Sequence, residues 1–268
     1  MRNTRPLPQQ PAPSQPGPPA PRPRPGRGRG RRLARRAAVG LGTLAGVLAI
    51  GAGVLWVATP PASEATQLAK AQAARHGIAY PGPDVPANFA RPLVATEDHR
   101  FYRDPGLDPL AVARVVQAKV SDGRDQGGAT IEQQLAKMLY TPGESGFKAE
   151  VKQVALAFKL NLAYSKQQIL NLYAEVAYYG HGFYGLEQAS CGYFGHPARD
   201  LTVVQGAMLA GVVNAPSADD PVKYPGNARF RLEHVIARMV AVGYLSKAQG
   251  QRALSAPLGL SRGHKPDC

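Results

Sequence analysis

The order of hydrophobic and polar positions divides this chain into five regions. Residues 1–36 contain almost no apolar side chains, whereas residues 37–58 form one apolar run without a charged residue. Over residues 85–260, apolar positions recur at the spacing of one face of a helix. Residues 59–84 are interpreted as a linker between the apolar run and this helical region, and residues 261–268 as a short tail.

The region 85–260 is predicted to fold as one mostly α-helical domain. Gly or Pro separates most of the expected helices, as is typical of helix boundaries. These helices cover residues 110–120, 131–140, 151–164, 166–179, 200–213 and 228–242. No stretch alternates apolar and polar residues over enough positions to indicate a sheet.

Residues 37–58 are predicted to form a transmembrane helix, because about 20 apolar residues are needed to cross a bilayer. A cleaved signal peptide is the alternative, but the run is longer than a typical signal core and follows a long polar arm. The segment RGRGRRLARR precedes the run, and the other flank has no Lys or Arg close by. The positive-inside rule therefore predicts a single-pass protein of the cell membrane, with a cytoplasmic arm and an extracytoplasmic domain.

The arm of residues 1–36 is rich in Pro, Gly, Gln and Arg, and it is expected to be disordered. All its charged side chains are Arg, so it accounts for most of the formal net charge of +14. The segment RGRGRR resembles nucleic-acid-binding segments. Its position beside the membrane helix favours contact with anionic lipids or a role in topology instead, and no nucleic-acid partner is expected.

The stretch from Ala95 to Lys137 carries the strongest chemical signal. Two carboxylates, Glu97 and Asp98, head an aromatic segment, and a double glycine precedes a helical run that carries several polar side chains. Those side chains are Thr130, Gln133, Gln134 and Lys137. A carboxylate that takes a proton and a cationic helix face that holds an anion suit group transfer from a phosphate leaving group.

Other short patterns do not indicate a further site. The two cysteines, Cys191 and Cys268, imply no disulfide framework, and Cys191 is expected to be a buried thiol. Residues 180–185 fit G-x-G-x-x-G, but no strand precedes them. Residues 145–148 fit S-x-x-K without the companion motifs of a penicillin-binding domain. The six histidines have no zinc-binding spacing, so no protein-held metal is predicted.

Five segments carry a resemblance to a known family. They are EDHRFYRDPGLDP, GGATIEQQLAKMLY, YSKQQILNLY, YYGHGFYGLEQASCGYFG and LAGVVNAPSADDP. In this order they resemble the motifs of the peptidoglycan glycosyltransferases, glycosyltransferase family 51. The resemblance implies a lysozyme-like helical fold with a membrane-seated lobe between the first two motifs. No transpeptidase module follows, so the chain resembles the monofunctional members.

The resemblance implies an enzyme that polymerises lipid II into glycan strands and releases undecaprenyl pyrophosphate. Glu97 matches the position of the general base, which takes the proton of the attacking 4-hydroxyl. The implied substrate-binding residues are Asp98, Arg114, Thr130, Gln133, Gln134, Lys137, Lys152, Ser217 and Arg231. Mg²⁺ or another divalent cation beside the pyrophosphate is implied by the resemblance alone. The implied partners are lipid II, the nascent strand, the membrane and, as further candidates, cell-wall synthesis proteins.

One motif departs from the family pattern. The family's Arg-Lys-x-x-Glu falls on residues 149–153, so the basic pair becomes Ala149 and Glu150, and the second acid becomes Gln153. Because Gln cannot be anionic, no charged base can act at that position.

Two hypotheses follow from this loss, and the completeness of the other motifs favours the first. The chain is a working variant in which Glu97 suffices, Lys148 or Lys152 supplies positive charge, and Glu150 takes over the catalytic carboxylate role of the position held by Gln153. Alternatively, it is a catalytically impaired homologue that binds lipid II or acts as a scaffold. A lytic, glycan-cleaving enzyme is a third, less favoured hypothesis, since cleavage needs no pyrophosphate-binding helix.

Overall fold

The computed structural model describes residues 17, 27–104, 129–261 and 268. The chain divides into two compact units, Met1–Ala52 and Gly53–Cys268. The described residues are mostly helical, which confirms the predicted fold class. The helix expected over 110–120, which carries Arg114, lies outside the described residues.

The N-terminal helix α1 (Arg27–Ala58) is, in the described part of the chain, the one helix whose length and composition would let it cross a membrane. It ends at Ala58, where the apolar run ends. It begins at Arg27, however, so the end of the arm expected to be disordered is helical. Arg, Leu and Ala are good helix formers, and they extend a helix that the apolar run already nucleates. Apart from Gly17, the rest of the arm lies outside the described residues.

The expected linker 59–84 is not a simple connection. It contains a 3₁₀ turn, η1 (Ala62–Glu64), and helix α2 (Ala65–Arg75). One face of α2 is buried and consists of Ala65, Ala69 and Ala73. Alanine buries little area, so this face gives only a weak hydrophobic signal in the sequence. The folded domain therefore begins about twenty residues before the predicted start at residue 85. The buried alanines of α2 are four residues apart, which is the spacing of one helix face.

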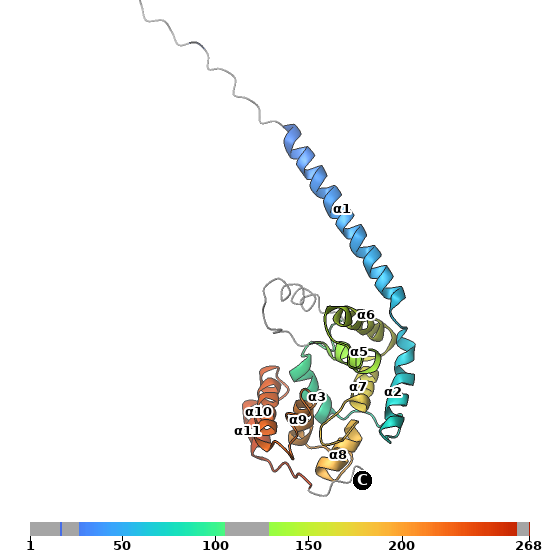
Figure 1. Ribbon diagram of the computed structural model, residues 1–268. Helices are drawn as coiled ribbons and strands as arrows, with labels where there is room; N and C mark the ends of the chain where they lie inside the picture. Colours follow the sequence, from blue (N-terminus) through green and yellow to red (C-terminus); the bar gives the residue numbers. More distant parts are fainter. Residues whose placement is uncertain (1–16, 18–26, 105–128, 262–267) are drawn as a thin grey trace, which may run out of the picture. The chain divides into compact units, whose positions relative to one another are not determined.

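One group of helices surrounds α3 (Ala87–Glu97), which packs against α9 (Val203–Val212) and α10 (Pro225–Ala241) (Figure 1). Helix α9 is buried over most of its length, and α11 (Lys247–Ser255) packs against α10. Gly206 of α9 lies against the backbone of α3. A Cβ atom on residue 206 would come within 1.8 Å of the Asn88 carbonyl oxygen, so the two helices can approach this closely because the residue is glycine. This close packing lies at the N-terminal end of α3, and Glu97 is the last residue at the other end of the same helix.

A second group consists of α5 (Ile131–Tyr140), α6 (Phe147–Ala163) and α7 (Lys166–Val176), with α2 beside α5 and α7 (Figure 1). Their apolar faces form the main hydrophobic core. Helices α5, α7, α9 and α11 each start with a capping box, in which a Ser or Thr exchanges hydrogen bonds with a Gln three residues later. These boxes fix where the helices begin.

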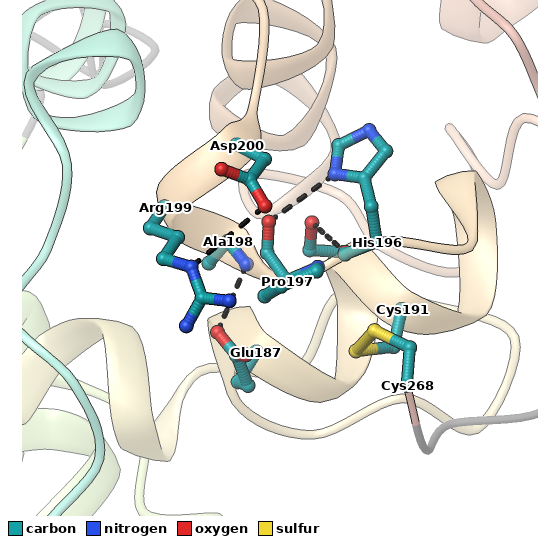
Figure 2. Close-up of a disulfide and its surroundings, with 9 residues drawn as sticks. Glu187, Cys191, His196, Pro197, Ala198, Arg199, Asp200 and Cys268 are labelled. Atoms are coloured by element: carbon teal, nitrogen blue, oxygen red, sulfur yellow. Dashed lines mark hydrogen bonds and ion pairs between the residues drawn. A yellow bond between two sulfur atoms is a disulfide. The ribbon is translucent and has the colours of Figure 1, made fainter.

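Helix α8 (Leu186–Phe194) and the 3₁₀ turn η2 (Ala198–Asp200) complete the domain. The expectation of a buried free thiol is wrong, because Cys191 of α8 is bonded to Cys268 (Figure 2). Their Cα atoms are 5.4 Å apart, which suits a disulfide. The Ser261 amide donates to the Tyr193 carbonyl, so the fold itself brings the tail to α8. Two cysteines 77 residues apart show no such contact in the sequence.

Candidate active site

Glu97 and Asp98 lie where α3 ends. Glu97 is the last residue of the helix, and Asp98 leaves the helical conformation with φ −155° and ψ 75°. The change of backbone direction gives the two neighbouring carboxylates different surroundings. The side chain of Glu97 is only 6% exposed, so any group that reaches it must come from a few fixed directions.

Three side chains from separate segments contact the Glu97 carboxylate. The amide nitrogen of Gln134 donates to Oε2 at 2.9 Å. The amide nitrogen of Asn214 lies 3.4 Å from Oε1 and 3.5 Å from Oε2. The Arg231 Nη2 atom lies 3.6 Å from Oε1. All three are donors, which suits an ionised carboxylate, since that group only accepts hydrogen bonds.

A buried tyrosine holds the Gln134 amide in one orientation. The hydroxyl of Tyr173 donates to Gln134 Oε1 at 2.9 Å, and the Gln134 nitrogen also donates to the Ala129 carbonyl at 3.3 Å. Burial, and secondarily the charge of Glu97, raise the pKa of Tyr173, which therefore stays a protonated donor. With its oxygen engaged by Tyr173, Gln134 presents its NH₂ group to Glu97.

Arg231 is tied to both the backbone and the carboxylate. Its Nε atom donates to the Gly211 carbonyl at 3.3 Å, beside its ion pair with Glu97. A Cβ atom at position 211 would come within 2.9 Å of the Arg231 side chain, so glycine allows this approach. The charge of Arg231 also acts on a histidine of the same helix. Burial first, and then the charges of Arg231 and Arg238, lower the pKa of His234. Arg231 is thus held at the Glu97 carboxylate.

Asp98 faces a different environment. Its Oδ2 atom accepts a hydrogen bond of 3.5 Å from the Ile131 amide, at the start of α5. Burial, and then the nearby charge of Glu132, raise the pKa of Asp98 to about 6. Glu132 is itself buried and forms an ion pair of 2.6 Å with Lys166. Asp98 therefore helps position the start of α5.

Three polar residues of the GGATIEQQLAK segment have separate surroundings. Thr130 and Gln133 form the capping box of α5, and both are buried. Their polar groups therefore hold the start of the helix. Lys137 is exposed, and its side chain has no hydrogen bond or ion pair within the described residues. It follows Gln134 by three residues, so both lie on one face of α5.

The residues of the departing motif contact the other end of α5. Gln153 donates to the Thr141 hydroxyl at 2.9 Å, and Lys152 pairs with Glu144 at 3.0 Å. Thr141 lies about 10 Å beyond Gln134 along the helix axis, from the rise per residue. Glu150 is exposed, and its side chain contacts no polar partner among the residues described. Within the described residues, no hydrogen bond joins Gln153 to Glu97.

The remaining expected residues stay apart from this cluster. Ser217 is exposed, and the described residues offer its side chain no hydrogen bond. Arg114 lies outside the described residues. Within those residues, no group of three or more His, Cys, Asp or Glu side chains is placed to hold a metal ion. The described side chains therefore do not form a metal site of their own.

Two contacts of this site were missed in the sequence. Asn214 lies in the segment LAGVVNAPSADDP and Tyr173 in YSKQQILNLY, but neither was singled out. A donor side chain within a motif segment was the available signal for both. Their partners are far away in sequence: 117 residues separate Asn214 from Glu97, and 39 separate Tyr173 from Gln134.

Comparison with known proteins shows one consistent match. A family model described as "Transglycosylase" matches residues 64–240. A protein named as a transglycosylase from Cupriavidus necator is 37% identical over 66% of this chain and 76% of its own length. Penicillin-binding protein 1F of Bacillus subtilis is 36% identical, and penicillin-binding protein 1A of Aquifex aeolicus is 35% identical.

The two penicillin-binding proteins are much longer than the matched region. The matches cover 66% and 68% of this chain but 25% of each penicillin-binding protein. Among solved structures, penicillin-binding protein 1A from Haemophilus influenzae is 28% identical, with a TM-score of 0.35, over 49% of this chain and 16% of that one. The site around Glu97 lies inside the matched residues.

Proposed function

The chain belongs to the transglycosylase family and is a glycosyltransferase, and from this we propose that it polymerises lipid II into glycan strands with release of undecaprenyl pyrophosphate. The observation that carries the proposal is the nearly buried Glu97 carboxylate, on which amide and guanidinium donors from three other segments converge. An oriented, ionised carboxylate of this kind suits a general base.

In the proposed reaction, the 4-hydroxyl of lipid II attacks the anomeric carbon of the growing strand. A new C–O bond forms as the bond from that carbon to the pyrophosphate oxygen breaks, and the hydroxyl proton passes to Glu97. Gln134 lies at 2.9 Å from Oε2, whereas Oε1 has only the longer contacts to Asn214 and Arg231. Oε1 is therefore the better proton acceptor.

The leaving pyrophosphate needs positive charge as it departs. Lys137 is exposed and lies one turn beyond Gln134 on the same face of α5, which supports a role at the leaving group. Arg231, whose guanidinium lies beside Oε1, could stabilise the same charge from the other side. A divalent cation implied by the family resemblance would be held mainly by the pyrophosphate oxygens, and no step above depends on it.

The position of Gln153 supports a working variant over a binding-only homologue. Its amide holds the buried Thr141 hydroxyl at the far end of α5, away from Glu97. Glu150 is exposed and has no polar partner in the described part of the chain, which offers no support for a catalytic substitute there. Glu97 is then the single carboxylate on which the reaction depends.

We further propose that α1 anchors the enzyme in the cell membrane with the arm in the cytoplasm. The Arg-rich start of α1 and its apolar continuation support this orientation. The glycosyltransferase domain then lies on the extracytoplasmic side, where polyprenyl-linked sugars are polymerised.

The purified full-length protein in lipid nanodiscs, incubated with lipid II and with preformed glycan, tests the proposal. We expect polymer from lipid II, and Glu97→Gln should lower its rate at least about 100-fold. Glu233→Gln is the matched control, since Glu233 is 49% exposed and its ion pair among the described residues is with Arg229 on the surface of α10. Shortened glycan would instead support a lytic enzyme. Lipid II binding without either product would support the scaffold hypothesis.

A further inference from the structure

A buried lysine of α6 holds the last turn of α1, and the proposed reaction does not use it. Lys159 is 7% exposed. Its ammonium donates to the carbonyl oxygens of Trp56 at 2.7 Å, Thr59 at 2.7 Å and Pro60 at 3.0 Å. An ammonium has three N–H donors, so each one is used. Lys159 is therefore saturated by backbone acceptors from one short segment.

These carbonyl groups need an outside partner because α1 ends there. The last carbonyls of a helix have no partner within it, and Pro60 has no N–H with which to continue the helix. A cation is also favoured at the negative end of a helix dipole. Burial lowers the pKa of Lys159, and the three carbonyl contacts offset the cost of burying its charge.

Aromatic side chains complete the attachment. The Lys159 ammonium lies 4.9 Å from the centroid of the Trp56 ring, which packs edge-on against Phe158 at 6.1 Å. The Tyr140 hydroxyl lies 3.2 Å from the carbonyl oxygens of both Pro61 and Ala62, which share its single proton. The Tyr164 hydroxyl donates to the Ala62 carbonyl at 3.1 Å. We call this set, residues 56–62 with their partners Tyr140, Lys159 and Tyr164, the joint.

We propose that Lys159 is a positioning residue that holds residues 56–62, where the membrane helix ends, against the glycosyltransferase domain, and so limits the depth at which the domain meets lipid-borne substrate. The attachment of residues 56–62 follows from the contacts alone, whereas the role in substrate access rests on the proposed function. A pyrophosphate on a long polyprenyl chain stays at the membrane surface, so the height of Glu97 above that surface limits the reaction.

The charge of Lys159 is what the joint requires. Polar contacts to the backbone cannot be replaced by an apolar side chain, and one buried and two partly buried carbonyl oxygens would then lose this donor. Trp56 is 44% exposed beside this cluster, a position that suits an anchor at the membrane interface. The joint therefore couples an interfacial anchor to α6, which packs directly against α5 of the active site.

The test compares Lys159→Met, which keeps the aliphatic stem and removes the donors, with the wild type and with Lys70→Met. Lys70 is an exposed lysine of α2 and serves as the matched control. Each full-length protein is placed in nanodiscs. Hydrogen–deuterium exchange is measured over residues 53–66 and over α9. Polymerisation is then measured with the undecaprenyl-linked substrate in the bilayer and with a water-soluble analogue on a short prenyl chain.

We expect faster exchange at residues 53–66 in Lys159→Met, with exchange in α9 unchanged. We also expect kcat/KM to fall about tenfold or more for the bilayer substrate and by less than about threefold for the soluble analogue, because only the former needs a fixed depth. Unchanged exchange at the joint would overturn the proposal, and so would equal losses on both substrates.

A second variant keeps the proposal testable if Lys159→Met fails to fold. Trp56→Leu removes the ring beside the ammonium without altering the buried core, and the same direction of change is expected with a smaller size. If the wild type polymerises neither substrate, the proposed function fails. The exchange measurement then still decides whether Lys159 holds the joint.

Discussion

Two nearly buried charges in this domain, Glu97 and Lys159, are held in opposite ways. Lys159 has three backbone acceptors at 2.7 to 3.0 Å, all from one short segment. Glu97 has one hydrogen bond of 2.9 Å, and its other contacts, to Asn214 and Arg231, are 3.4 to 3.6 Å long. The partners of Glu97 are side chains that belong to three separate segments.

The difference corresponds to what each charge must do. Backbone carbonyls cannot move away from Lys159 unless the joint opens, so its ammonium is locked. A general base must gain a proton and lose it again, so its partners have to tolerate both states. Side-chain donors at long distances can rearrange, and the Oε1 atom of Glu97 keeps room for a hydroxyl. Saturation thus distinguishes a structural charge from a reactive one in the same domain.

The largest expected effect in this comparison comes from adding a second acid beside Glu97. Gln134→Glu would place two carboxylates within hydrogen-bonding distance, and such a pair shares a proton. The ionised base is then depleted, and we expect polymerisation at neutral pH to fall about 100-fold, in line with the loss of a general base. The rate of polymerisation from lipid II measures the effect.

Gln167→Glu is the control for that substitution. Gln167 is an exposed residue of α7 whose amide donates to Asn171, away from the active site. It should retain the wild-type rate. Near-normal activity in Gln134→Glu would show that Glu97 does not need the neutral amide donor of Gln134. The contrast between a reactive Glu97 and a structural Lys159 would then not hold.

A smaller effect is expected from a change at Asp98. Its partly buried carboxyl group accepts one long hydrogen bond, from the Ile131 amide. The pKa of Asp98 is raised to about 6 by burial and by Glu132, from 3.8 for the ordinary side chain. The folded state then binds a proton more tightly than the unfolded chain does. The stability due to neutral Asp98 is therefore present below about pH 4 and lost as the pH rises through about 6.

Asp98→Asn should remove that pH dependence. Asn can still accept the hydrogen bond from the Ile131 amide, and it carries no charge beside Glu132 and Asp104. We expect the free energy of unfolding of Asp98→Asn to equal that of the wild type near pH 4. As the pH rises to 6.5, it should exceed the wild-type value by an increasing amount, on the order of 1–2 kcal/mol. Melting temperatures measured over this pH range report the difference. A constant difference across this range would contradict the assignment.

What could be read from the sequence depended on how local each signal was. Helix α5 was predicted over 131–140, and the structure places it at Ile131–Tyr140, because its apolar period and its Thr130 cap lie in one continuous segment. Helix α2 was missed because its buried face is made of alanines. The disulfide was missed because its cysteines are 77 residues apart.

The same limit applies to the candidate site. Glu97 and Gln134 lie in the ordered motifs, Arg231 was implied by the family resemblance, and the structure brings the three together. The motif order could not show that Arg231 pairs with the carboxylate, because this contact depends on packing between α10 and α3 and leaves no local pattern in the chain. The role of Gln133 in the helix cap is different, since its partner Thr130 is only three residues away and the pair matches the local capping-box pattern.

The smallest effect is expected where a carboxylate is restored far from Glu97. In Gln153→Glu the new side chain can accept a hydrogen bond from the Thr141 hydroxyl, because a hydroxyl donates as readily as it accepts. The contact at the end of α5 would then survive with its direction reversed, and stability should change by less than about 0.5 kcal/mol. We expect the polymerisation rate to stay within about threefold of the wild type or to rise, since the added charge lies about 10 Å beyond Gln134. The lipid II assay and a thermal melt measure both quantities. A large loss of activity with normal stability would give Gln153 an active role of its own, and Glu97 would no longer be the single residue on which the reaction rests.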